Sequence, residues 1–153
     1  FFSSSPRGNM ATSSSALLHG LCADIAAAGS VSDEQWKLLA FVCPEALLGA
    51  AEILDHRSVQ CIIASESRRA FHLVSSAAGF KGAHPHVSLP GFCTCGSFCH
   101  KVAARPDATV CKHELAALLS AGVGKCERVD KDDAAWANEL SHRLQMAMLA
   151  HMA

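Results

Sequence analysis

The sequence has no tyrosine, two tryptophans and seven phenylalanines, so aromatic residues make up only 6% of its 153 residues. Half of the residues are nevertheless apolar, and alanine is abundant among them. A chain with few large rings and many small apolar residues favours helices that pack closely on small contact residues. The length and the apolar fraction together predict one domain with a core of its own.

An excess of charge of one sign is also missing, because 13 basic and 14 acidic residues give a net charge of −1. This balance argues against a strongly basic protein that binds nucleic acid by charge alone, although it leaves room for a local basic patch. No stretch approaches the roughly 18 apolar residues of a membrane span. We therefore expect no membrane association.

The Ser-rich residues 1–15 contain no apolar run of the kind found in a secretory signal. Without such a signal, the eight cysteines are interpreted as thiols or metal ligands in a reducing compartment, not as disulfides. Residues 1–13 are expected to form a disordered tail, since Ser, Pro, Gly and Asn dominate there. Residues 14–153 are expected to form the single domain.

The apolar pattern predicts an α+β fold that begins with helices. A first helix is expected from Ser15, a second after a capping box of Ser32 and Gln35, and a third from Pro44. After Arg57 the period changes to that of strands. Two short runs then predict an antiparallel hairpin, at residues 58–65 and 70–76.

Beyond the hairpin, the sequence predicts a third strand over residues 87–95 and a helix from Cys111 to Gly122. Residues 123–130 are expected to link that helix to a last one, which starts near Lys131. One apolar stripe runs along the last helix, interpreted either as core or as a partner surface: Trp136, Leu140, Leu144, Ala147 and Met148.

Four of the eight cysteines lie in one short stretch between Gly91 and Leu119. Cys93 and Cys95 form a C-x-C pair, and residues two apart on a strand point to the same face, so both sulfurs can reach one ion. Cys111 and His113 form a C-x-H pair, whose side chains diverge within a helix but can converge at its entrance. Three thiolates and one imidazole predict a single closed, structural Zn²⁺ site.

Other interpretations of the cluster are weaker. A disulfide between Cys93 and Cys95 would close a very small, strained ring, and a catalytic pair of Cys111 and His113 would lack a third orienting group. Cys99 and His100 remain as candidates for a spare ligand. Cys99 could replace one member of the set, but it could equally pack in the core.

No phosphate-binding loop of the form G-x-x-x-x-G-K-[ST] is present. The nearest stretch, "GVGKC" at Gly122, lacks the first glycine and ends in cysteine. No open metal position and no nucleophile with a base is evident either, so the sequence predicts a protein that is not an enzyme.

The pattern C-x-C-x15-C-x-H, on a strand-then-helix background, resembles the SWIM zinc finger, a ββα unit that would span about residues 80–122. All four ligand positions match. The chain from about residue 15 to 144, and "AAEILDHRSVQCIIASESRRAFHLV" in particular, looks like the small SWIM-domain subunit of the Shu recombination complex. That group also carries an alanine three residues after the histidine, where this chain has Ala116. The segment "GSFCHKV" departs from the expected pattern by its additional Cys-His pair.

The resemblance implies a nuclear, non-enzymatic subunit that forms a heterodimer with a RecA-like recombinase paralogue. Such a subunit would promote homologous recombination and double-strand break repair, and could meet single-stranded DNA through the complex. Ala116, Trp136 and Leu140 are the candidates for partner binding. Two alternatives stay open: a zinc module that binds DNA directly, or a SWIM adaptor in a ubiquitin or transposase-like pathway. The candidates for direct DNA binding are Arg68, Arg69 and Lys112.

Overall fold

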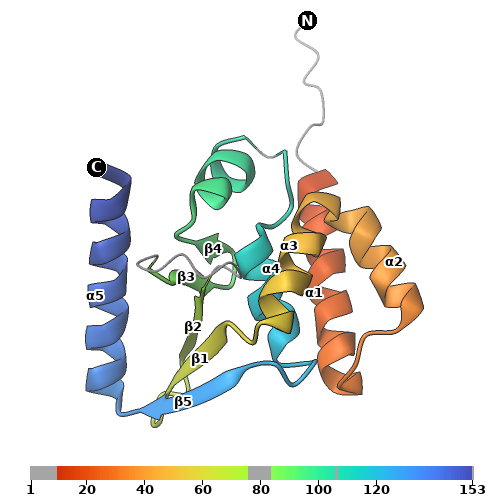
Figure 1. Cartoon of the computed structure of the whole chain (residues 1–153). Helices are drawn as coiled ribbons and strands as arrows, with labels where there is room; N and C mark the ends of the chain where they lie inside the picture. Colours follow the sequence, from red (N-terminus) through yellow and green to blue (C-terminus); the bar gives the residue numbers. More distant parts are fainter. Residues whose placement is uncertain (1–9, 76–83, 106, 153) are drawn as a thin grey trace, which may run out of the picture.

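The computed structural model describes residues 10–75, 84–105 and 107–152. They form a five-stranded sheet with helices on both of its faces (Figure 1). The chain begins with three helices: α1 (Met10–Ala28), α2 (Asp33–Val42) and α3 (Pro44–Asp55). Four strands and a π-helix follow: β1 (Val59–Ala64), β2 (Ala70–Val74), β3 (His86–Leu89), β4 (Phe92–Cys93) and η1 (Phe98–Ala104). The chain ends with α4 (Lys112–Ser120), β5 (Glu127–Lys131) and α5 (Asp133–Met152). The α+β class predicted from the sequence is therefore confirmed.

Local signals place the boundaries of the N-terminal helices. The Ser32 side chain accepts a hydrogen bond from the Gln35 backbone N–H, and the Gln35 side chain accepts one from the Ser32 N–H, so the predicted capping box is present. Pro44 opens α3, where its missing N–H has no helical partner to lose. The first helix begins at Met10 instead of Ser15, so residues 10–13 are helical where a tail was expected. The rest of that tail, residues 1–9, lies outside the described residues.

The sheet has the strand order β4-β3-β2-β1-β5, and all neighbours are antiparallel except β1 and β5. The predicted hairpin is β1 and β2, in a register that places Cys61 opposite His72. The single strand expected over residues 87–95 is two short strands, because the chain reverses at Gly91, which has a φ of +74°. Glycine adopts this left-handed conformation without a Cβ clash.

The strand β5 corrects the prediction that residues 123–130 only link two helices. Its five residues, "ERVDK", contain one apolar side chain, Val129, so the segment lacks the alternation that marks a strand. It forms by parallel pairing of its backbone with β1, from Gln60 opposite Glu127 to Ala64 opposite Lys131. Its charged side chains at the sheet edge disfavour the addition of another strand.

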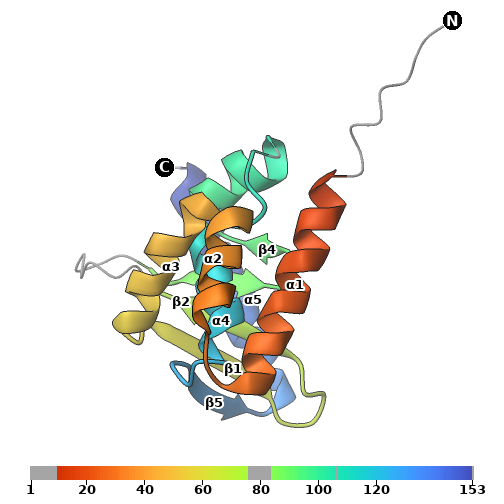
Figure 2. The ribbon, with the colours of Figure 1, turned by 90° about the vertical axis from the view of Figure 1, so that its right-hand side faces the viewer.

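Helices cover both faces of the sheet. On one face, Trp136 of α5 packs with residues of β1, β2 and β3. On the other, α4 packs between the sheet and the N-terminal helices, which Figure 2 shows from the side of α1 and α2. Leu115, Ala116 and Leu119 of α4 are almost completely buried there. None of the described helices is both long and apolar enough to span a bilayer.

Candidate metal centre

The four ligands predicted from the sequence lie together. The thiol sulfurs of Cys93, Cys95 and Cys111 and a ring nitrogen of His113 all lie within 4.8 Å of one another, and all four residues are buried. Cys93 ends β4 and Cys95 lies between β4 and η1, while Cys111 precedes α4 and His113 lies in its first turn. The cluster therefore joins the end of the sheet to the start of α4.

The entrance of α4 explains how the C-x-H pair converges. Cys111 is the N-cap of the helix, with extended backbone angles (φ −89°, ψ 163°), and so lies outside the regular helical spiral. Its sulfur accepts a hydrogen bond from the Glu114 N–H at 3.4 Å. This bond occupies the position of an ordinary N-cap bond, and the positive end of the helix favours a thiolate there.

The donor chemistry fits a soft cation. Hydrogen bonds from the thiols of Cys111 and Cys93 lower the pKa of Cys95 far below its usual range, whereas hydrogen bonds to Cys111 and Cys95 raise that of Cys93. The first thiolate thus forms easily, but the next one needs a compensating positive charge. Both ring nitrogens of His113 are buried without a hydrogen-bond partner among the described residues. An ion held by the three sulfurs and one of these nitrogens would supply the positive charge and give that nitrogen a partner.

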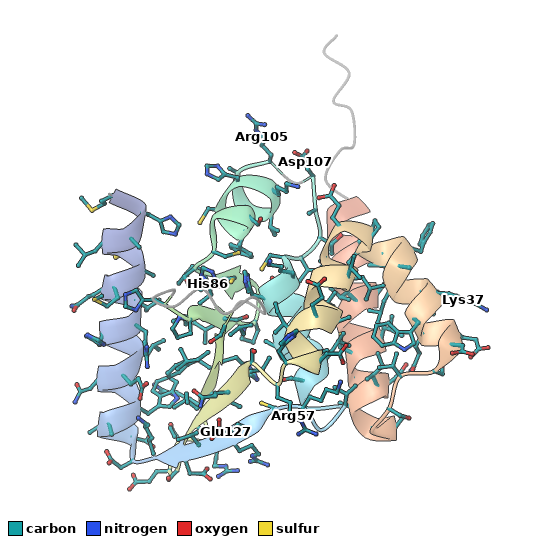
Figure 3. The ribbon with its side chains drawn as sticks, in the orientation of Figure 1. Lys37, Arg57, His86, Arg105, Asp107 and Glu127 are labelled. Atoms are coloured by element: carbon teal, nitrogen blue, oxygen red, sulfur yellow. The ribbon has the colours of Figure 1, made fainter. Side chains whose placement is uncertain are left out.

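A set of contacts around the ligands was not predicted. Thr94, between the two cysteines, accepts a hydrogen bond from the Val87 N–H on its hydroxyl (2.9 Å) and donates its own N–H to the Val87 carbonyl (3.0 Å). A ring nitrogen of His151, near the end of α5, lies 2.8 Å from the Thr94 carbonyl. The centroid of the His86 ring, which is labelled in Figure 3, lies 4.3 Å from the centroid of the His113 ring. Contacts from β3 and α5 therefore fix the orientation of the ligands.

Glu114 has a supporting role that its sequence position did not reveal. Its carboxylate is buried and accepts a hydrogen bond from the Gly91 N–H at 2.9 Å, which fixes the β3–β4 turn to α4. Burial raises the pKa of this carboxyl group above its usual value. The side chain thus supports the geometry of the cluster from outside the ligand set.

We expect Glu114→Ala to lower the free energy of unfolding by about 0.5 to 1.5 kcal/mol, the usual net contribution of one hydrogen bond, because Gly91 is exposed and its N–H can bond to water instead. Urea denaturation of the zinc-loaded protein would measure this change in the free energy of unfolding. Glu114→Gln retains an oxygen that can accept from Gly91, so it should cost less than Glu114→Ala. Equal stability of Glu114→Ala and the unmodified protein would contradict the role assigned to this carboxylate.

The other sequence candidates lie apart from the cluster. Cys99 and His100 are exposed on η1, and neither belongs to the group of converging donor atoms. Arg68 and Arg69 are exposed beside the β1–β2 turn, whereas Lys112 is exposed on α4. The three basic residues thus come from two separate elements, and DNA binding by them stays a prediction.

The partner-binding candidates are mostly inside the chain. Ala116 is completely buried in the core around α4, and Trp136 is buried between α5 and the sheet. Leu140 is partly buried beside Trp136. In the chain alone these side chains serve packing, and a direct contact with a partner stays a prediction.

Comparison with known proteins agrees with this site. The chain is 27% identical over 117 residues to zinc finger SWIM domain-containing protein 7 of Danio rerio. The aligned region covers 74% of this chain and 79% of that protein. The identity to the proteins of the same name is 25% for Homo sapiens and 26% for Mus musculus, each over 76% of this chain and over 81% and 75% of those proteins. No protein-family model and no solved structure gives a match. The three similarities and the Cys₃His cluster support a SWIM-type, zinc-binding protein like zinc finger SWIM domain-containing protein 7.

Proposed function

We propose that this chain is a non-enzymatic, zinc-binding subunit of a Shu-type complex, which acts in the nucleus with a RecA-like recombinase paralogue. In this role it promotes homologous recombination and the repair of double-strand breaks, and the partner supplies any nucleotide chemistry. The observation that carries the proposal is the buried Cys₃His cluster, in a chain that is similar to zinc finger SWIM domain-containing protein 7 over about three quarters of its length.

The cluster favours a structural role for its ion. Zinc in proteins is usually four-coordinate when structural, and a catalytic ion usually has three protein ligands and a water molecule. Cys93, Cys95, Cys111 and His113 supply four donors, and all four residues are buried. A zinc ion bound by all of them has no position for a reacting water molecule.

The proposed partner surface is formed by α2 and α3. Their large apolar side chains project into solvent, with 83% exposure for Phe41, 74% for Leu48 and 46% for Leu38. Exposed aromatic and aliphatic side chains of this size are typical of protein–protein contacts. The α2–α3 side lies opposite α5 across the sheet (Figures 1 and 2).

The test is affinity purification of the tagged protein from its own cells, with identification of the co-purifying proteins. We expect a stoichiometric RecA-like ATPase with the unmodified chain and its loss with Cys111→Ser. Phe41→Ser should reduce capture at least tenfold without changing the zinc content or stability, because its side chain contributes almost nothing to the core. Leu149→Ser, which alters an exposed apolar side chain on α5, is the matched control and should retain capture.

Two results would replace the proposal. Ubiquitin-pathway or transposon-derived partners, without a recombinase paralogue, would assign the chain to another SWIM protein pathway. Binding of single-stranded DNA by the isolated chain, steeply dependent on salt and lost in Arg68→Ala or Lys112→Ala, would favour a direct DNA-binding module.

A further inference from the structure

A second group of metal-ligating side chains lies outside the SWIM-type cluster. The donor atoms of Cys61, His72 and Cys126 all lie within 4.8 Å of one another. Cys61 is in the middle of β1, His72 is in β2, and Cys126 immediately precedes β5, whose first residue, Glu127, is labelled in Figure 3. Three segments that are far apart in the sequence thus contribute one donor each.

The pairing of the strands brings the three donors to one face of the sheet. Cys61 is opposite His72 in the antiparallel pair and opposite Arg128 in the parallel pair. Cys126 is two residues before Arg128, and residues at this spacing on an extended chain point to the same side. Val59 and Val74, two residues from Cys61 and His72, are buried in the core around α4, so the donors lie on the α4 face.

The new group is separate from the first one along α4. Cys111 caps the start of this helix, whereas Cys126 follows its last residue, Ser120, by six positions. Nine helical residues correspond to about 13 Å at 1.5 Å per residue. One ion therefore cannot serve both groups.

We propose that Cys61, His72 and Cys126 form a second Zn²⁺ site, with two thiolates and one imidazole as ligands and a fourth position open to solvent. Cysteine and histidine are the donors that zinc prefers, and two thiolates neutralise its charge. All three residues are partly buried, so the site is sheltered by the sheet and α4 but accessible to an ion from solvent.

The site also meets a structural need of the sheet. The edge strand β5 has one apolar side chain, and few apolar contacts hold it. Near its start, polar contacts already link the chain to distant segments: Lys125 pairs with Asp55 at 2.6 Å, and Gln60 donates to Glu127 at 2.7 Å. An ion bound to Cys126, Cys61 and His72 would join the beginning of β5 to β1 and β2.

Zinc analysis of the full chain tests the proposal. The reduced protein is saturated with Zn²⁺, freed of excess ion by gel filtration and analysed by mass spectrometry for metal per chain. We expect two ions for the unmodified protein and one for Cys126→Ser and for His72→Asn. Cys99→Ser is the control, because Cys99 is exposed and belongs to neither group. This variant should retain two zinc ions.

Alkylation of the saturated protein identifies the cysteines involved. Zinc at the second site should protect Cys61 and Cys126 from iodoacetamide, whereas Cys99 should react. Reconstitution with Co²⁺ should show thiolate-to-cobalt absorption that decreases in Cys126→Ser but does not disappear, because the first site is intact.

One ion per chain in the unmodified protein, with Cys61 and Cys126 alkylated at saturating zinc, would overturn the proposal. A mass lower by two hydrogens in the zinc-treated protein, located to Cys61 and Cys126, would also overturn it, because a disulfide leaves no thiolates to bind the ion. Neither measurement depends on the recombination partner, so the second zinc site can fail or hold independently of the proposed function.

Discussion

Replacement of Cys111 by serine is expected to release zinc from the Cys₃His site and to unfold much of the chain. Cys111 has two roles, since its sulfur is one of four converging donors and also accepts the Glu114 N–H at the start of α4. Structural zinc contributes about 10 kcal/mol or more to the folding of small zinc modules, and a whole domain is stable by only about 5 to 15 kcal/mol. Loss of one ligand therefore removes a large fraction of the total stability.

The measurement combines zinc per chain with thermal unfolding followed by circular dichroism. Cys99→Ser is the matched control, because Cys99 is exposed and outside the cluster. It should retain the zinc content and melting temperature of the unmodified protein. A chelator should lower the melting temperature of the unmodified protein and of Cys99→Ser alike. A Cys111→Ser protein that has lost the zinc of the Cys₃His site and still melts at the normal temperature would show that the cluster is not a structural zinc site.

The first metal cluster was predictable from the sequence because its ligands come in two local pairs. Cys93 and Cys95 are two residues apart, as are Cys111 and His113, so the spacing itself indicates the chemistry. The group of Cys61, His72 and Cys126 gives no such signal. Its members meet only through the register of β1 with β2 and with β5, which single-residue patterns do not encode.

The same distinction applies to the fold. The capping box at Ser32, the helix start at Pro44 and the β1–β2 hairpin follow from residues that are close in sequence, and all three are present. The strand β5 depends on pairing with a strand 67 residues earlier, and its charged sequence resembles a linker. The π-helical turn η1 was also missed, because "FCHKVAA" has no pattern that separates it from a loop or a short α-helix.

Other cysteines show how burial changes their chemistry. Burial raises the pKa of Cys22 and Cys43 to about 11, so these two thiols stay protonated at neutral pH. Both lie in the core formed by the N-terminal helices and α4. They act there as small apolar side chains. This packing role accounts for two cysteines that belong to neither metal group, and it agrees with the interpretation of the cysteines as thiols or metal ligands.

Replacement of Trp136 by alanine is the second change with a large expected effect. Among the described residues of α5, Trp136 is the one buried side chain, so it holds the helix on the sheet. Its ring meets Phe71 edge-on at 5.5 Å, and its Nε1–H donates to the Ile62 carbonyl at 3.0 Å. We expect the free energy of unfolding to fall by about 3 to 5 kcal/mol, the usual cost of such a truncation in a core.

Trp136→Phe separates the two contributions of this side chain. It retains a ring that can pack against Phe71 but removes the N–H, so it should cost about 1 to 3 kcal/mol, less than Trp136→Ala. Both values come from urea denaturation of the isolated, zinc-loaded chain. Normal stability of Trp136→Ala, together with loss of partner capture, would contradict the core role and make Trp136 an interface residue.

The position of α5 predicts a further consequence of Trp136→Ala. The far end of this helix reaches the metal centre, where the His151 ring lies 2.8 Å from the carbonyl of Thr94, between two of the ligands. Loosening α5 from the sheet removes this contact, so the zinc affinity of Trp136→Ala should fall. His151→Ala, which removes the contact but leaves Trp136 in place, should weaken zinc binding with little loss of global stability. If only Trp136→Ala weakens zinc binding, the effect passes through the core and not through His151.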